Sequence, residues 1–271
     1  MGESGFVEVP GGSLYYEAAG SGPAVLLVHA GVANLRMWDP LVPLLSDRYR
    51  VIRYDTRGFG MTESEHVEFS NRDDLVAVLD DGGAETATVV GASRGGIIAL
   101  DSVIEYPARF DALVVVGGGV SGFEPSTAVG EPGMWEEAER MWEAHEWEGL
   151  CDLETRWWVD GPGQPTDRVD PAVREIVHGW ILSNYRAEKV EGIPKPLQPP
   201  AFERLEEVAV PTLVMMGGLD DPGTNEACRL LASRVAGATT IVYDGAAHMM
   251  TLEHPGRFAD DLLAFLDAVH A

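Results

Sequence analysis

The chain has 271 residues, enough for one large domain, and 45% of them are hydrophobic, so it can bury a sizeable core. Its 19 basic and 44 acidic residues give a formal net charge of -25, which argues against binding to nucleic acid or anionic lipid, because both need basic patches. Cys151 and Cys228 form neither a CxxC pair nor a disulfide framework, so we expect free thiols in a reducing cytoplasm.

The first predicted element is a hairpin, with strands at 6–9 and 14–18 around a turn of Pro and Gly. The first ten residues lack a basic stretch followed by an apolar run, so no signal peptide is expected. No segment of the sequence is apolar for long enough to span a bilayer. The sequence therefore predicts a cytoplasmic protein with no membrane partner.

Short, continuous apolar runs follow the hairpin, and such runs are typical of strands buried on both faces of a parallel sheet. Helical patterns separate them. The runs lie at 24–29, 50–55, 88–92 and 112–117, and the helical patterns at 71–79 and 95–106. This alternation predicts right-handed crossovers and a doubly wound, mostly parallel α/β sheet.

The alternation stops between residues 121 and 205, where the predicted elements are all helical. These helices lie near 134–148, 152–159 and 171–185. The alternation then resumes with strands at 212–217 and 240–243 and helices at 225–235 and 255–269. We therefore predict one α/β domain, residues 1–120 and 206–271, interrupted by a helical cap at 121–205.

A Gly-x-Ser-x-Gly pattern centred on Ser93 joins a predicted strand to a predicted helix, which is the context of a nucleophile elbow. A serine on so tight a turn needs small neighbours, and Gly91, Gly95 and Gly96 provide them. The head of the helix also offers unpaired N–H groups to developing negative charge. The pattern predicts a nucleophilic serine; the alternative is a glycine-rich turn with an idle serine.

A serine nucleophile needs a general base, and His248 is the best placed histidine. It follows the last predicted strand, and the carboxyl ends of parallel strands share one edge of the sheet with Ser93. Asp220 follows the preceding predicted strand and is expected to orient the imidazole. Asp221 is a rival because spacing alone does not separate adjacent acids, and Asp244 is a weaker one.

The oxyanion hole is expected to combine two backbone N–H groups. One belongs to Arg94, directly after the serine, and the other to Gly31 in the loop after the first parallel strand. His29, in the same loop, is expected to brace the loop rather than to act as a base.

With these residues, the sequence resembles the α/β-hydrolase superfamily over nearly its whole length. The chain is most similar to the capped group that includes small esterases, enol-lactonases, cofactor-free haloperoxidases, epoxide hydrolases and carbon–carbon hydrolases. The matching stretches are His29-Ala30-Gly31 followed by Trp38, Tyr54-Asp55-x-Arg57-Gly58-x-Gly60, Gly91-x-Ser93-x-Gly95-Gly96, Gly217-x-x-Asp220 and Gly245-x-x-His248. Most relatives have Gly where Ala30 stands, which implies a tighter oxyanion loop. A serine in place of aspartate argues against epoxide hydrolase and haloalkane dehalogenase chemistry.

The predicted cap is rich in tryptophan. Six of the seven Trp lie there: Trp135, Trp142, Trp147, Trp157, Trp158 and Trp180. A cap above the carboxyl edge would form a lid, and its aromatics would favour an apolar or aromatic substrate. We expect Trp38, Trp135, Trp158 and Met249 to bind substrate; for any single cap Trp, packing against the core is the alternative.

The sequence therefore predicts a serine hydrolase that needs no metal or organic cofactor. Its expected reaction is cleavage of a small carboxylic ester or lactone through an acyl-enzyme on Ser93. Two alternatives stay open: a carbon–carbon bond hydrolase with the same triad, and a ligand-sensing protein with little turnover. The expected partner is a small-molecule substrate, and the expected assembly is a monomer or homodimer.

Overall fold

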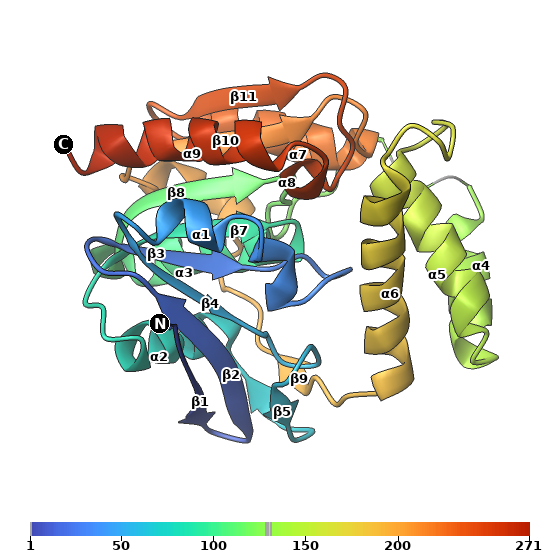
Figure 1. The fold of residues 1–271 in the computed structure, drawn as a ribbon, viewed down its shortest axis with the longest axis horizontal. Helices are drawn as coiled ribbons and strands as arrows, with labels where there is room; N and C mark the ends of the chain where they lie inside the picture. The colour runs from blue at the N-terminus through green and yellow to red at the C-terminus, as the bar shows by residue number, and fades with distance from the viewer. Residues whose placement is uncertain (1, 128–129, 131) are drawn as a thin grey trace.

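The computed structural model describes residues 2–127, 130 and 132–271. In this part of the chain, one nine-stranded sheet runs through the molecule in the order β1-β2-β4-β3-β7-β8-β10-β11, with β5 paired to β2 off this path (Figure 1). Residues 128, 129 and 131, which fall in the predicted cap, lie outside the described residues.

The strands of the described chain differ in direction along the sheet. β1 and β2 are antiparallel, and so are β2 and β4, whereas each neighbouring pair from β4 to β11 is parallel. Their bounds are β1 Glu3–Val9, β2 Gly12–Ala19, β3 Ala24–Val28, β4 Arg50–Tyr54, β5 Glu63–Ser64, β7 Ala87–Ala92, β8 Phe110–Val116, β10 Thr212–Gly217 and β11 Thr239–Tyr243. A separate two-stranded pairing joins β6 (Glu68–Phe69) to β9 (Ile193–Pro194).

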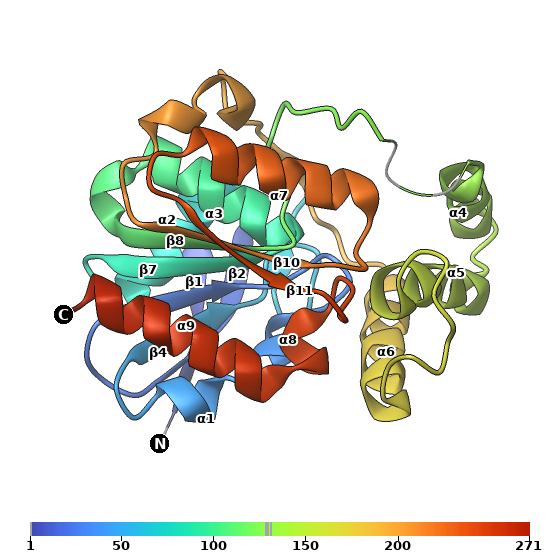
Figure 2. The ribbon, with the colours of Figure 1, turned by 90° about the horizontal axis from the view of Figure 1, so that it is seen from above.

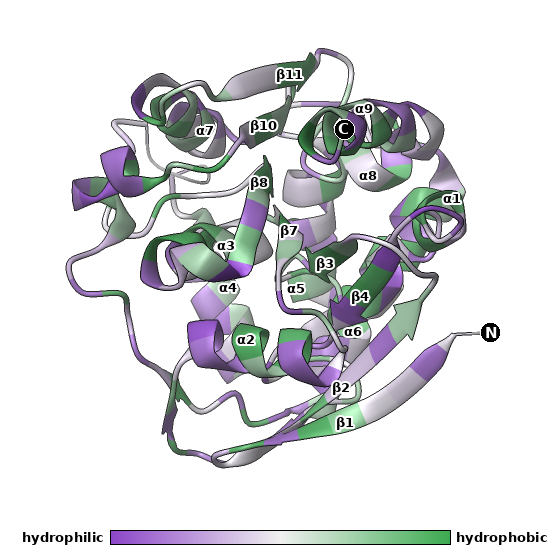
Figure 3. Cartoon of the chain, turned by 90° about the vertical axis from the view of Figure 1, so that its left-hand side faces the viewer, coloured by the Kyte–Doolittle hydropathy of each residue, from purple (hydrophilic) through white to green (hydrophobic). Residues whose placement is uncertain are grey.

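Helices cover both faces of the sheet, with α2, α3 and α7 on one side and α1, α8 and α9 on the other (Figures 2 and 3). Their bounds are α1 Val42–Leu45, α2 Asn71–Asp81, α3 Arg94–Glu105, α7 Pro222–Arg234, α8 Met250–Glu253 and α9 Pro255–Val269. Short helical turns lie at η1 Leu35–Trp38, η2 Pro107–Arg109, η4 Ala201–Glu203 and η5 Leu205–Glu207. The predicted doubly wound α/β fold is confirmed.

The two sides of the sheet hold separate apolar clusters, because successive side chains of a strand point to opposite faces. In β3, Leu26 and Val28 join the cluster under α2, α3 and α7. Val25 and Leu27 join the cluster under α1, α8 and α9. Both faces are therefore buried, which explains why the strands read as continuous apolar runs.

The cap helices lie beyond the carboxyl ends of the parallel strands (Figures 1 and 2). They are α4 Met134–Glu143, α5 Trp147–Glu154, a π-helical segment η3 Thr155–Asp160, and α6 Pro171–Ala187. The predicted helix over 134–148 is divided in two, because His145 takes a positive φ of 55° and turns the chain. Val177 and Ile181 of α6 join the core cluster around α9 and so attach the cap to the α/β domain.

The chain returns to the core before residue 205. β9 pairs with β6, and Leu197, Ala201 and Leu205 are buried in the cluster under α2, α3 and α7. The helical layer thus occupies 134–187, within the predicted insertion at 121–205. Among the residues described, no helix combines the length and apolar character needed to cross a bilayer.

Candidate active site

Ser93 is the single residue that joins strand β7 to helix α3. β7 ends at Ala92, α3 starts at Arg94, and Ser93 has φ 52° and ψ -117°. A positive φ in a residue with a side chain costs on the order of 1–3 kcal/mol and persists only where the surroundings impose it. Here the Ser93 N–H donates to Val116 O at 2.8 Å, and Ser93 O accepts from Gly96 N–H at 2.8 Å.

Two glycines let strand and helix come close enough to form this turn. A Cβ on Gly91 would lie 2.1 Å from Gly95 O, and a Cβ on Gly95 would lie 2.3 Å from Val28 O. Both separations are far below van der Waals contact with backbone atoms that cannot move aside. The small neighbours that the Gly-x-Ser-x-Gly pattern requires are therefore needed for packing at this turn.

His248 and Asp220 form a buried pair at the carboxyl ends of the last two strands. His248 Nδ1 lies 2.8 Å from Asp220 Oδ2, and the two residues are 6% and 5% exposed. The other carboxylate oxygen, Asp220 Oδ1, accepts from Asp221 N–H at 2.7 Å. The carboxylate is thus held from both sides, which fixes the orientation of the imidazole.

Asp221, the rival acid, has a different role in the structure. Its Oδ1 accepts from Thr224 N–H at 2.9 Å and caps the N-terminus of α7, while Oδ2 accepts from Gly130 N–H at 3.1 Å. A carboxylate is a favourable N-cap because it satisfies N–H groups that a helix leaves unpaired. His248 therefore pairs with Asp220 rather than with Asp221.

Gly117 and Gly118 lie between Ser93 and the His248–Asp220 pair. A Cβ on Gly117 would lie 3.2 Å from Asp220 Oδ2 and 3.3 Å from His248 Nδ1. A Cβ on Gly118 would lie 3.4 Å from Ser93 O. The serine turn and the His–Asp pair thus flank two consecutive residues at one edge of the sheet.

His29 is buried and braces the loop after β3. Thr56 N–H donates to His29 Nε2 at 3.1 Å, so the ring proton sits on Nδ1, which lies 2.8 Å from Ala30 O. Burial lowers the pKa of His29 to about 3, against a smaller raising effect of the bond to Ala30. The ring is therefore neutral, with both nitrogens occupied by the backbone.

Gly31 and Arg94, the residues with the two expected oxyanion donors, lie beside each other. A Cβ on Gly31 would lie 3.7 Å from Arg94 Cδ. Ala30 N–H donates to Met37 Sδ at 3.2 Å, whereas Gly31 makes no hydrogen bond within the described chain. Arg94 is the first residue of α3, so its N–H is one of those that a helix leaves unpaired.

The Arg94 side chain is already engaged by protein groups. Its Nη1 donates to Thr56 Oγ1 at 2.7 Å, and its Nη2 forms an ion pair with Glu191 at 2.5 Å. The guanidinium also lies 5.1 Å from the centroid of the Phe59 ring. Its charge is therefore compensated and is not free to attract an anionic substrate.

The four predicted substrate-binding residues divide into two pairs. The Trp158 ring lies 4.6 Å from the His248 ring, and Trp135, which is 41% exposed, lies 6.4 Å from Trp158. Trp38 and Met249 are each 1% exposed and pack in the apolar cluster around α9. Trp158 thus lies next to the histidine and Trp135 next to Trp158, whereas the other two side chains fill the core.

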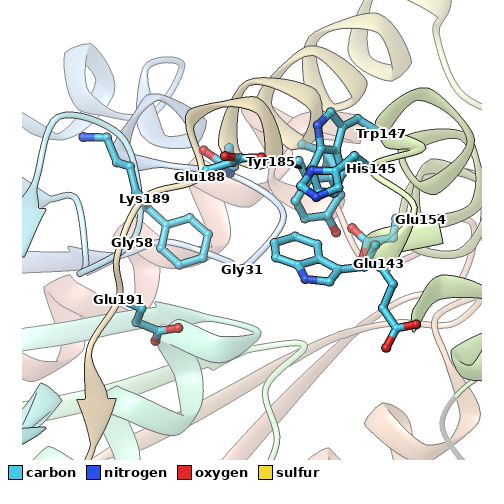
Figure 4. A pocket seen from close by; sticks show the side chains of 14 residues that line it. Gly31, Gly58, Glu143, His145, Trp147, Glu154, Tyr185, Glu188, Lys189 and Glu191 are labelled. Carbon is cyan, nitrogen blue, oxygen red and sulfur yellow. Dashed lines mark hydrogen bonds and ion pairs between the residues drawn. The ribbon is translucent and has the colours of Figure 1, made fainter. Parts of the chain in front are cut away.

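A cavity of about 520 Å³ opens between the cap and the core, next to Gly31 (Figure 4). It is lined by Gly31, Gly58, Phe59, Trp142, Glu143, His145, Trp147, Glu154, Ile181, Asn184, Tyr185, Glu188, Lys189 and Glu191. Ser93 and His248 are not among these described lining residues. The sequence indicated an aromatic cap but did not single out Trp142 or Trp147, because their side-chain directions depend on how the cap helices pack. The described residues contain no group of three or more His, Cys, Asp or Glu side chains arranged for a metal ion.

Arg168, a cap residue that the sequence did not indicate, ties the cap to the histidine loop. Its Nη1 donates to Gly245 O at 2.8 Å, and its Nη2 donates to Val159 O at 2.7 Å. The same guanidinium forms an ion pair with Glu253 at 2.5 Å, and Glu253 Oε1 accepts from Ala247 N–H at 2.9 Å. One side chain thus joins the segment before Gly161 to the loop that carries His248.

Residues 25–261 match the model of the alpha/beta hydrolase family. The chain belongs to this family. It is similar to 3-oxoadipate enol-lactonase 1 of Acinetobacter baylyi, at 26% identity over 91% of this chain and 90% of that protein. It is also similar to pimeloyl-[acyl-carrier protein] methyl ester esterase of Aliivibrio salmonicida, at 25% identity over 94% of this chain and 96% of that protein. Among solved structures, a thermophilic esterase from Thermogutta terrifontis superposes with a TM-score of 0.80, at 25% identity over 99% of this chain and 100% of that chain.

Proposed function

We propose that this protein hydrolyses a carboxylic ester or lactone with Ser93 as the nucleophile, His248 as the base and Asp220 as the acid that orients it. The observation that carries the proposal is the backbone of Ser93, held at a φ of 52° at the head of α3, across Gly117 and Gly118 from the His–Asp pair. The relatives support the substrate class, because two of them are named as an enol-lactonase and a methyl ester esterase and align over nine-tenths of the chain.

The first half of the reaction forms an acyl-enzyme. With the Nδ1 proton donated to Asp220, His248 Nε2 carries a lone pair that takes the hydroxyl proton as Ser93 Oγ bonds to the carbonyl carbon. The carbonyl oxygen becomes an oxyanion. When the tetrahedral adduct collapses, the bond to the leaving oxygen breaks, and this oxygen takes the proton from His248.

The second half repeats these steps with water. His248 takes a proton from water as its oxygen attacks the acyl carbon, and the bond to Ser93 Oγ then breaks. Ser93 regains its proton and the carboxylic acid departs. For a lactone the alcohol stays attached to the acyl chain, so the single product is a hydroxy acid.

Two backbone N–H groups stabilise the oxyanion, those of Gly31 and Arg94. Each donor of this kind contributes about 10²–10³ in kcat when it is preorganised. The N–H of Gly31 has no partner within the described residues, and Gly31 lies against the Arg94 side chain. Both donors are therefore available without breaking an existing hydrogen bond.

An apolar or aromatic substrate fits the surroundings of the base. Trp158 lies 4.6 Å from the His248 ring, and Trp135 extends the aromatic surface from Trp158 toward solvent. Such side chains bury apolar substrate area at little entropic cost. We therefore propose Trp158 and Trp135 as substrate-binding residues.

A labelling experiment tests the nucleophile. Wild type, Ser93→Ala and the control Ser233→Ala, an exposed serine on α7, are incubated with a fluorophosphonate probe and with short and medium p-nitrophenyl esters. We expect labelling and ester turnover in wild type and Ser233→Ala and neither in Ser93→Ala. Labelling without ester turnover would overturn the ester assignment in favour of carbon–carbon bond hydrolysis. Absence of labelling in wild type would overturn Ser93 as a nucleophile and leave a ligand-binding protein.

A further inference from the structure

The cavity beside Gly31 has an aromatic wall built by the cap. The Trp142 ring lies 5.1 Å from the Trp147 ring and 5.4 Å from the Tyr185 ring, each in an edge-to-face arrangement. Trp147 and Tyr185 stand on the cap side of the cavity, opposite Gly58 and Glu191 on the core side (Figure 4). Faces of Trp and Tyr carry negative electrostatic potential, so such a wall attracts cations as well as apolar groups.

The charged groups around the cavity are mostly acidic. The carboxylates are those of Glu143, Glu154, Glu188 and Glu191. Glu191 is paired with Arg94, and Glu188 lies 3.1 Å from His145 Nδ1. Lys189 also lines the cavity, but its ammonium points away and donates to Thr62 O at 2.8 Å. Arg94 therefore compensates Glu191, whereas Glu143 and Glu154 have no ion-pair partner among the described residues.

Glu154 is the most enclosed of these carboxylates. Burial raises the pKa of its carboxyl, and a hydrogen bond from the Tyr185 hydroxyl acts in the opposite direction. Within the described residues Glu154 forms no ion pair. A half-buried carboxylate with no cation beside it gains from a positive charge that binds next to it.

The cavity also adjoins the proposed reaction centre. Gly31, a proposed oxyanion donor, forms part of its lining. A Cβ on Gly31 would lie 3.7 Å from Arg94 Cδ. Phe59 and Glu191, two further lining residues, contact the guanidinium of Arg94, which directly follows Ser93. A substrate whose carbonyl oxygen meets Gly31 would therefore place one of its substituents in the cavity.

We propose that this cavity binds a positively charged ammonium group of the substrate, held by the faces of Trp142, Trp147 and Tyr185 and by the carboxylate of Glu154. The inference rests on the proposed function only in taking the ligand to be an ester. Aromatic rings attract an ammonium group more strongly than a neutral group of the same shape, so the charge alone provides discrimination against neutral isosteres.

Binding is measured first, without turnover. Isothermal titration calorimetry compares choline with its neutral carbon isostere 3,3-dimethylbutan-1-ol, which has the same shape. We expect choline to bind at least about tenfold more tightly. Glu154→Gln and Trp142→Leu should each remove most of this preference, whereas Trp142→Phe should keep part of it. Glu148→Gln is the matched control, because Glu148 lies on the same helix, pairs with Arg186 and is exposed.

Turnover then separates this inference from the proposed function. The substrates are acetylcholine and 3,3-dimethylbutyl acetate. We expect a kcat/KM at least about tenfold higher for the charged ester than for the neutral one, and Glu154→Gln should lower this ratio. Equal rates for both esters, or equal binding of choline and its isostere, would overturn the ammonium site and leave the esterase intact. Preferential choline binding without hydrolysis of either ester would overturn the esterase and leave the ammonium site.

Discussion

Acid should destabilise this protein through His29, because the folded chain keeps this ring neutral. Burial lowers the pKa of His29 from its usual 6.5 to about 3. Between these two values the unfolded chain takes up a proton on the ring and the folded chain does not. The contribution of the neutral His29 ring to the stability of the folded state is therefore fully present above pH 6.5. It is lost progressively as the pH falls toward 3.

The magnitude follows from the size of the shift. A difference of one pKa unit corresponds to about 1.4 kcal/mol, and the unfolded ring is already half protonated at pH 6.5. Lowering the pH from 6.5 to 4.5 therefore removes roughly 2 kcal/mol of the free energy of unfolding through this ring. This is a substantial part of the 5–15 kcal/mol typical of the free energy of unfolding of a globular protein.

Urea unfolding of wild type, His29→Gln and the control His66→Gln between pH 7 and pH 4.5 isolates this contribution from that of the many carboxyl groups. His66 is exposed, so its substitution should leave the pH dependence parallel to that of wild type. The advantage of wild type over His29→Gln should shrink by about 1.4 kcal/mol per pH unit below pH 6.5. Parallel curves for all three proteins, or an NMR titration of the folded His29 ring with a midpoint near 6.5, would refute the reasoning.

Other contacts give further predictions. Ser93→Gly should be more stable than Ser93→Ala by about 1 kcal/mol in urea unfolding, because glycine takes the positive φ of this turn without strain; equal stabilities would argue against strain. Asp74→Asn should lower the free energy of unfolding by about 3–5 kcal/mol in thermal unfolding, because it leaves the buried guanidinium of Arg57 without its bidentate partner. A decrease below about 1 kcal/mol would contradict this expectation. Arg168→Ala should lower kcat for p-nitrophenyl esters about tenfold with little change in KM. Arg168→Lys, which keeps the pair with Glu253 but not the full set of donors to three carbonyls, should recover only part of kcat; unchanged kcat in a folded variant would remove Arg168 as a positioning residue.

The sequence alone predicted the α/β architecture, because each element depended on a local pattern. The apolar run at 24–29 indicated a strand buried on both faces, and β3 is such a strand, divided between two clusters. The Gly-x-Ser-x-Gly pattern indicated the turn at Ser93, because the close approach of Gly91 and Gly95 is a property of a few adjacent residues.

The cap was predicted in outline only. Its helices were expected from periodicity, but the turn at His145 and the return of the chain to the core before residue 205 depend on what those segments pack against. The sequence indicated aromatic side chains in the lid but, for the same reason, not which of them line the cavity. A tryptophan on a helix can face the core, the solvent or a cavity, and the sequence shows only that it is there.

The residues of the candidate site illustrate the same division. Ser93, His248 and an acid after β10 followed from the order of elements, since parallel strands bring their carboxyl ends to one edge. Only the tertiary structure separated Asp220 from Asp221, by pairing one with His248 and making the other the cap of α7. Adjacent residues share their spacing and chemistry, so the direction of each side chain is decided by distant partners. Local patterns thus determined which elements form, and long-range packing determined which side chains meet.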